Sequence, residues 1–279
     1  MSSLWTLHKE EIMDTDRIAQ AVAFAGTALV DAGAIAIRYF RRPLNIDNKL
    51  SDGGFDPVTR ADREIEDFLR QQLTSAFPEF GVIGEEQGRS PGTSGIDWII
   101  DPIDGTKSFI SGLPTWGMLL GLCASDRALA GMMYQPFTGE LFQGGEGEAY
   151  LVRGEQRQRL RSRQTALLAD ATLFCTHESM FVEPAHLAAF RRVAARARLV
   201  RFGADCYAYC MLAMGLIDLV IEDTLQPYDI VPLIPVIEGA GGVITDPQGR
   251  PPLQGGFVIA AANADLHRQA LQVLALTPR

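Results

Sequence analysis

The chain has few cysteines and few histidines, four of each among 279 residues. The cysteines lie far apart except Cys206 and Cys210, and no histidine or second cysteine pair completes a zinc-binding spacing. The N-terminal residues lack the basic and apolar regions of a secretory leader, so we expect buried free thiols in a cytoplasmic protein. The scattered histidines form no Ser-His-Asp or Cys-His motif that would supply a covalent nucleophile.

Runs of positive charge and long apolar runs are also missing. The net charge is −9, which gives no electrostatic footprint for nucleic acid. The nearest basic stretch, residues 153–163, is flanked by acidic residues and is interpreted as a solvated loop or an edge hairpin. The most apolar early segment, AVAFAGTALV, stops at Asp31 after ten residues, about half the length of a membrane span. We therefore expect neither a nucleic-acid nor a membrane partner.

The first part of the chain has helical periodicity. Residues 14–42 repeat apolar positions at helical spacing and are predicted to form one long helix. The Asp-, Gly- and Asn-rich segment 44–56 is typical of a mobile turn or hairpin. Thr59 is expected to cap a second helix, because Asp62 follows at the spacing of a capping box.

The remaining pattern indicates a layered α/β protein. Residues 116–152 consist of short β-like runs with turn signals between them, whereas the second half alternates strands and helices. We predict two subdomains, an N-terminal α+β half over 1–150 and a C-terminal α/β half over 151–279.

The stretch WIIDPIDGTKSF is expected to place Asp101 at the end of a buried strand and Asp104 just around the turn that follows. Asp101 and Asp104 would repel each other and resist burial unless a cation lies between them. Gly105 and Thr106 follow at once, and their backbone N–H groups favour an anion such as phosphate. A divalent cation that bridges to a phosphate satisfies both groups, and Mg²⁺ suits oxygen ligands best.

Further carboxylates end strands or begin helices elsewhere. Glu85 and Glu86 follow a short strand in a Gly-rich turn, Asp229 is expected just before a helix, and Asp62 lies on the second helix. Each has an ordinary explanation as a solvated loop or a helix cap. Together they stand where α/β folds place their sites, at the ends of strands.

Three segments, GEEQG, WIIDPIDGTKSF and PYDIVPLIPVIEGAGG, resemble in order and spacing the signatures of the inositol monophosphatase superfamily. The resemblance extends over the chain from about residue 15. It implies an α/β fold, the layered αβαβα sandwich of the inositol monophosphatase and fructose-bisphosphatase type. It also implies a Mg²⁺-dependent, lithium-sensitive phosphomonoesterase that forms a homodimer.

The resemblance implies two or three Mg²⁺ ions in each active site. Glu85, Asp101 and the backbone carbonyl of Ile103 would hold the first ion. Asp101, Asp104 and Asp229 would hold the second.

The catalytic set implied by the resemblance is Asp62, Thr106 and Glu85. Asp62 and Glu85 would help to place a third ion, and Asp62 with Thr106 would activate the attacking water. Gly105 and Thr106 would donate amides to the phosphate. Lys49 would fall on a mobile loop that closes near the site.

Within the superfamily, RFGADCYAY, PYD and PVIEGAGGVITD resemble the histidinol-phosphate phosphatase branch, which acts in histidine biosynthesis. Asp205, with Glu222, could pair with the ammonium and imidazole groups of histidinol. The alternative is that Asp205 only caps the helix that starts near residue 206. Pro235 should remove a hydrogen bond of the helix expected over 230–240 or kink that helix. The full predicted substrate-binding set is Asp104, Gly105, Thr106, Asp205, Glu222 and Asp229.

Other functions remain open at this point. One is inositol-1-phosphate or broad sugar-phosphate hydrolysis. Another is adenosine 3′,5′-bisphosphate hydrolysis, for which no basic or aromatic nucleoside pocket is recognisable. A third is a non-catalytic sensor of metal or phosphate, against which the presence of Asp62, Thr106 and every required carboxylate argues.

Overall fold

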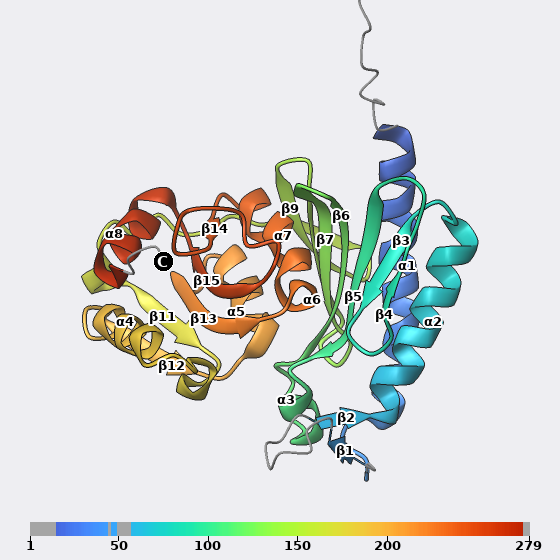
Figure 1. The fold of residues 1–279 in the computed structure, drawn as a ribbon, viewed down its shortest axis with the longest axis horizontal. Coiled ribbons are helices and arrows are strands. Elements are labelled where there is room, and N and C mark those ends of the chain that lie inside the picture. Colours follow the sequence, from blue (N-terminus) through green and yellow to red (C-terminus); the bar gives the residue numbers. More distant parts are fainter. Residues whose placement is uncertain (1–14, 44–45, 49–56, 276–279) are drawn as a thin grey trace, which may run out of the picture.

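A computed structural model describes residues 15–43, 46–48 and 57–275. Five layers follow one another across the molecule (Figure 1). Helices α1 and α2 cover one face of an eight-stranded sheet, α5 to α7 lie between that sheet and a five-stranded one, and α4 and α8 cover the far face. This arrangement confirms the predicted αβαβα sandwich. The helices are α1 (Thr15–Tyr39), α2 (Arg60–Ala76), α3 (Thr106–Ile110), α4 (Pro184–Ala194), α5 (Asp205–Ala213), α6 (Pro227–Ile230), α7 (Ile234–Gly239) and α8 (Ala264–Leu274), with 3₁₀ turns η1 (Leu168–Asp170), η2 (Glu178–Met180) and η3 (Val231–Leu233).

The large sheet has the strand order β10-β9-β8-β7-β6-β5-β3-β4 and is antiparallel except for the pair β3 and β5. The small sheet has the order β12-β11-β13-β15-β14. Its strand β11 runs parallel to both neighbours. The strands of these sheets are β3 (Gly81–Gly84), β4 (Gly88–Ser90), β5 (Ile96–Asp104), β6 (Gly117–Ala124), β7 (Arg127–Gln135), β8 (Glu140–Gly145), β9 (Glu148–Arg153), β10 (Gln156–Arg159), β11 (Thr172–Cys175), β12 (Leu199–Phe202), β13 (Leu219–Leu225), β14 (Val243–Thr245) and β15 (Gly256–Ala261).

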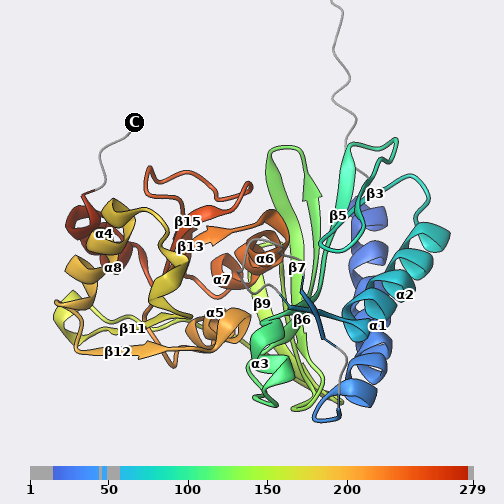
Figure 2. The ribbon, with the colours of Figure 1, turned by 60° about the horizontal axis from the view of Figure 1, so that its bottom comes forward.

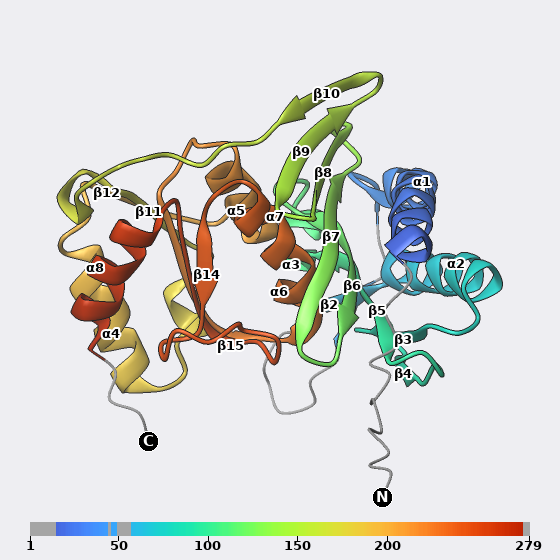
Figure 3. The same cartoon turned by 90° about the horizontal axis from the view of Figure 1, so that it is seen from above.

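Two connecting segments follow the expectations from their composition. The basic stretch 153–163 contains β10, an exposed edge strand that pairs with β9 as a hairpin (Figure 3). The large sheet therefore extends to Arg159, and the division of the chain at residue 150 stays a prediction. Strands β1 (Ile46–Asn48) and β2 (Pro57–Thr59) form a two-stranded antiparallel hairpin. Lys49, with the rest of 49–56, lies outside the described residues.

Helix α1 is the long helix predicted over 14–42. By length and composition alone, α1 is long and apolar enough to cross a membrane. The core helix of a folded domain passes the same test. One of its faces is lined by alanines such as Ala21, Ala25 and Ala32, which are fully buried. These small side chains let α1 pack closely on α2 and the large sheet (Figure 2). The packing is that of a core helix in a folded domain.

The middle layer meets the large sheet through glycines. In place of the single helix expected over 230–240, the chain forms η3 and α7, with Pro232 and Pro235 in their respective first turns, where a missing N–H group costs no helix hydrogen bond. A Cβ at Gly131 of β7 would stand 1.8 Å from the carbonyl oxygen of Pro232, and one at Gly144 would stand 2.3 Å from backbone atoms of Pro235. Backbone therefore packs directly on backbone where η3 and α7 meet β7 and β8.

We expect Gly131→Ala to destabilise the fold, because the added methyl group overlaps the Pro232 carbonyl. Overpacking of this kind costs about 1–3 kcal/mol or more. Gly145→Ala in the neighbouring strand is the matched control, since its Cβ would meet its nearest atom at an ordinary 3.4 Å. Denaturant unfolding measures both variants. Equal stability of the two would contradict this packing.

Candidate active site

The parallel pair β3 and β5 brings the first two acidic segments together. Gly84 pairs with Ile100 at the end of β3, and the next amide, Glu85 N, donates to the Ile100 carbonyl over 3.2 Å. The parallel register therefore sets Glu85 beside Asp101. This is the strand-end position at which α/β folds place their sites.

A bulge in β5 explains the spacing of its two aspartates. In a regular strand, residues three apart point to opposite faces. Between Asp101 and Asp104 the register shifts, so that three steps along β5 match two steps along β6, from Leu119 to Gly117. The extra residue turns both carboxylates to the same side. The strand thus continues through Asp104, whereas the sequence predicted a turn between the two aspartates.

Asp229 reaches the cluster from the other half of the chain. It lies inside α6 rather than before it, and its carboxylate accepts the Gln226 N–H over 2.7 Å in a capping box. Helix α6 packs against β5. Oxygen atoms of Asp101, Asp104 and Asp229 all lie within 4.8 Å of one another, so the capping role and the cluster coexist.

The N-terminus of α5 meets α3 at the same place (Figure 2). Cys206 N donates to the Asp104 carboxylate over 2.7 Å. The Asp205 carboxylate accepts the Ser108 hydroxyl over 2.6 Å and the Thr115 hydroxyl over 3.5 Å. The N-cap residue of α5 is Ala204, and among the described residues no side chain makes a capping hydrogen bond to this helix. The capping explanation of Asp205 is therefore wrong, and the side chain instead faces α3.

Asp62 and Thr106 are held by short local contacts. The predicted capping box is confirmed: Asp62 accepts the Thr59 N–H over 2.8 Å and the Thr59 hydroxyl over 2.6 Å. The Thr106 hydroxyl donates to the carbonyl of Ile103 over 3.1 Å. Asp62 and Ile103 are both buried, at 1% exposed, and neither is among the described residues that line the cavity.

A cavity of about 420 Å³ opens at this site, and Asp104 and Asp229 of the aspartate cluster are in its wall. Of the described residues that line it, five are acidic and one, Lys107, is basic. Glu222 is among them, although it is 2% exposed, and it accepts the Thr176 N–H over 2.7 Å and the Tyr209 hydroxyl over 2.9 Å. The predicted site residues that line the cavity are Glu85, Asp104, Gly105, Thr106, Asp205, Glu222 and Asp229.

Burial and mutual repulsion disfavour the charged form of the clustered carboxylates when no cation is bound. Burial, followed by the charges of Glu85, Asp104 and Asp229, raises the pKa of Asp101 well above its usual range. Burial and then the charges of Asp229 and Asp205 do the same to the pKa of Asp104. Burial raises the pKa of Asp229 to about 7, against the opposing hydrogen bond from Gln226. Converging hard oxygen donors of this kind fit a divalent cation such as Mg²⁺, which would neutralise them.

We expect the metal-free protein to lose stability as the pH rises. Burial also raises the pKa of Asp62 to about 7, and the charges of Glu86 and Glu85 contribute. A carboxyl with a higher pKa in the folded state binds its proton more tightly there. Its contribution to the free energy of unfolding is therefore complete below about pH 4, the pKa of the carboxyl in the unfolded state. The contribution is lost as the pH rises through the pKa of the folded state.

Denaturant unfolding in EDTA should therefore give a lower free energy at pH 8 than at pH 5.5, by on the order of a few kcal/mol. Mg²⁺ at pH 8 should restore the lost free energy of unfolding. Asp229→Asn should make the free energy of unfolding depend less on pH. A metal-free protein that is more stable at pH 8 would contradict the buried-repulsion account.

Several contacts of the site were not predicted from the sequence. Ser108 and Thr115 hold Asp205 from about 90 residues or more away along the chain. Tyr209 holds Glu222, and the Cys206 amide holds Asp104. Contacts between residues this far apart along the chain leave no spacing pattern in a single sequence, so no local signal identifies them.

Known proteins are similar to this chain in both sequence and fold. The model of the inositol monophosphatase family matches residues 18–276. The bifunctional phosphatase IMPL2, chloroplastic, of Arabidopsis thaliana is 38% identical over 276 residues, which covers 95% of this chain and 77% of the plant protein. The histidinol-phosphatase of Chlorobaculum parvum is 32% identical over 244 residues, which covers 87% of this chain and 92% of that protein.

The solved structure of an inositol monophosphatase from Zymomonas mobilis is 33% identical, with a TM-score of 0.79. The match covers 92% of this chain and 98% of that one. The family match over nearly the whole chain, together with these relatives, shows what kind of protein this is. The chain belongs to the inositol monophosphatase family and is a phosphatase that hydrolyses phosphate monoesters.

Proposed function

We propose that this phosphatase hydrolyses histidinol phosphate to histidinol and phosphate, with Mg²⁺ in the acidic cluster. The family is metal-dependent, and the converging carboxylates of this chain fit that chemistry. The observation that carries the choice of substrate is Asp205, a carboxylate in the wall of the cavity that is not among the three clustered aspartates. A relative named histidinol-phosphatase supports it.

Glu85, Asp101 and the Ile103 carbonyl would hold one ion, and Asp101, Asp104 and Asp229 would hold a second, with a third near Asp62. Ions held by these residues would supply positive charge for the phosphoryl oxygens, for a more acidic water and for the leaving oxygen. Without such charge, a cavity with five acidic side chains and one lysine would repel a phosphate dianion.

The protein's own groups orient the reactants. The capping box fixes the Asp62 carboxylate, which would accept the proton of the attacking water. The Thr106 hydroxyl, held near the Ile103 carbonyl, would position the same water. The amides of Gly105 and Thr106 would donate to the phosphate, since Gly105 adopts a left-handed φ of 80° at the start of α3.

The cationic end of histidinol would lie against Asp205 and Glu222. The hydroxyls of Ser108 and Thr115 hold the Asp205 side chain in place, so no rotamer freedom is lost when a ligand pairs with it. Both Glu222 oxygens accept a hydrogen bond from the chain, and Glu222 would therefore act mainly through its charge. Burial raises the pKa of Asp205, and a cation beside it would reverse that effect.

Inositol 1-phosphate is the second candidate, because an inositol monophosphatase of known structure is 33% identical. Its hydroxyls would give Asp205 only neutral hydrogen bonds, which are about half as strong as charge-assisted ones. A broad sugar-phosphate activity would use the same contacts. The non-catalytic sensor is set aside, because the chain is a phosphatase. Lithium sensitivity, the homodimer, the role in histidine biosynthesis and the cytoplasmic location stay predictions.

The test is phosphate release from histidinol phosphate, inositol 1-phosphate and adenosine 3′,5′-bisphosphate, each with Mg²⁺ and with EDTA. We expect preference for histidinol phosphate and loss of all activity in EDTA. Equal or better release from inositol 1-phosphate would overturn the substrate assignment and keep the metal site. Activity that persists in EDTA would overturn the metal site.

A further inference from the structure

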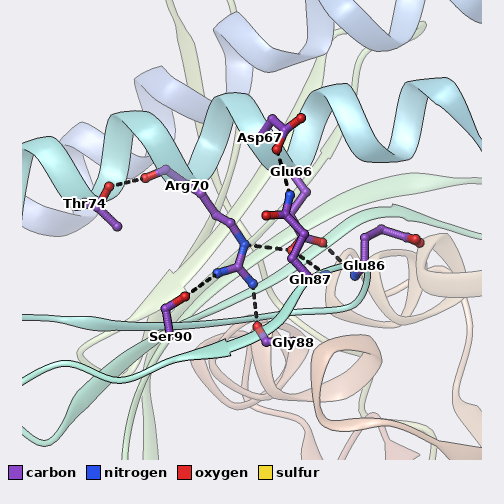
Figure 4. Close-up of polar contacts among 8 residues, drawn as sticks. All are labelled: Glu66, Asp67, Arg70, Thr74, Glu86, Gln87, Gly88 and Ser90. Carbon is purple, nitrogen blue, oxygen red and sulfur yellow. Dashed lines mark hydrogen bonds and ion pairs between the residues drawn. The ribbon is translucent and has the colours of Figure 1, made fainter.

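A buried ion pair lies beneath the turn that carries Glu85. Glu66 of α2 is fully buried, and its carboxylate accepts the backbone N–H groups of Glu86 over 2.8 Å and Gln87 over 3.1 Å (Figure 4). Arg70, one helical turn later, donates its Nε to the same carboxylate over 2.8 Å. The pair therefore ties helix α2 to the backbone that follows β3.

Further contacts from α2 hold the rest of this turn. Arg70 also donates to the carbonyl of Gly88 and, over 3.2 Å, to the Ser90 hydroxyl (Figure 4). The Gln87 side-chain amide donates to Asp67 over 2.8 Å. The turn between β3 and β4 is thus fixed from one side by a single helix face.

The ion pair lies so close to the end of β3 that it leaves no space for a side chain at Gly84. A Cβ at Gly84 would stand 2.3 Å from Oε1 of Glu66 and 2.8 Å from Nη2 of Arg70. Only glycine at this position lets the ion pair approach the strand end. The amide of Glu85 itself is fixed by the Ile100 carbonyl. Three successive amides, those of Glu85, Glu86 and Gln87, are therefore held.

Helix geometry couples this support to Asp62. Residues four apart share a helix face, so Asp62 and Glu66 lie one above the other on α2. The same rigid helix that presents Asp62 to the site also holds the backbone of the Glu85 turn. A buried ion pair is weak evidence of a role in stability, because apolar residues of similar volume often replace such pairs at no loss.

We propose that Glu66 and Arg70 are positioning residues that hold Glu85 in its metal-binding geometry relative to Asp62. This rests on the proposed function, in which Glu85 is a metal ligand. Residues that orient metal ligands change metal affinity by about 10- to 100-fold when they are replaced. Neither Glu66 nor Arg70 is among the described residues that line the cavity, and the pair acts through the backbone of Glu86 and Gln87.

The test is the affinity for Mn²⁺ alone, measured by electron paramagnetic resonance titration of the folded full-length chain. Glu66→Gln keeps the shape of the side chain but turns an N–H group toward donors. We expect Mn²⁺ affinity to fall by about 10- to 100-fold. Because this variant leaves Arg70 unpaired, a double variant, Glu66→Leu with Arg70→Leu, removes both charges. It should fold more stably than the single variant but still bind Mn²⁺ weakly, because the two amides lack an acceptor.

Asp218→Asn is the matched control. Asp218 is also fully buried, pairs with Arg163 over 3.3 Å and accepts the Thr172 N–H over 2.8 Å, but it lies immediately before β13 of the small sheet. We expect this control to bind Mn²⁺ as wild type does. An equal loss of affinity in the control would overturn the proposal, since it would show a general effect of destabilisation.

Glu85→Gln separates this proposal from the one on which it rests. If Glu85→Gln weakens Mn²⁺ binding while both Glu66 variants bind as wild type does, the positioning role is overturned and the metal site stands. If Glu85→Gln itself binds Mn²⁺ at wild-type affinity, Glu85 is no ligand and both proposals fail. Weak binding in the Glu85 and Glu66 variants, with a normal Asp218 control, supports the positioning role.

Discussion

We expect Asp101→Asn to reduce Mg²⁺-dependent phosphate release by at least about 1,000-fold, the largest effect of any substitution considered. Asp101 is 1% exposed and stands between Glu85, Asp104 and Asp229, whose charges all raise its pKa. As the residue shared by both proposed ion sites, it has no substitute in the cluster. A neutral amide removes charge that the cation needs while it keeps the shape of the side chain.

The same substitution should stabilise the metal-free protein at pH 8, because it removes one of several buried like charges. Activity and stability would then move in opposite directions, which a general folding defect cannot produce. Asp97→Asn is the control, since Asp97 lies on the same strand but pairs with Arg89 at the surface. Substantial activity in Asp101→Asn would contradict its shared role.

We expect Asp205→Asn to reduce kcat/KM for histidinol phosphate by at least about 2 kcal/mol, or roughly 30-fold. The loss with inositol 1-phosphate should be only a few-fold, because a polyol pairs with an amide nearly as well as with a carboxylate. Asparagine also tolerates the left-handed φ of 44° at this position, so the backbone of α5 should keep its start.

Steady-state kinetics on both substrates measure this ratio. Ser108→Ala is the control, because it removes the 2.6 Å hydrogen bond to Asp205 but leaves the charge in place. Ser108→Ala should change kcat/KM for the two substrates to a similar degree. If Asp205→Asn lowers kcat/KM for both substrates equally, Asp205 stabilises the structure and does not recognise a cation.

The layers of the fold could be predicted because they follow from local patterns. The long helix and the capping box of Thr59 and Asp62 each depend on residues close in sequence. The placement of acidic residues at strand ends likewise indicated a metal site. The division into halves at residue 150 was predicted too, but it stays a prediction.

The geometry of the site depended on contacts that a single sequence does not reveal. The β5 bulge is set by the partner strand β6, so the shared face of Asp101 and Asp104 needed the register. Asp205 meets Ser108 across the seam between the two halves. Glu66 reads as an ordinary helical glutamate, and only the packing of α2 on the β3–β4 turn gives it a role.

The most direct test of the central claim is anomalous diffraction from crystals of this chain soaked in Mn²⁺, which locates the ions. We expect anomalous peaks about 2.0–2.3 Å from carboxylate oxygens of Asp101, Asp104 and Asp229, with Glu85 as a further ligand. Peaks confined to other positions, or none at saturating Mn²⁺, would contradict the claim that these carboxylates converge to hold the catalytic metal.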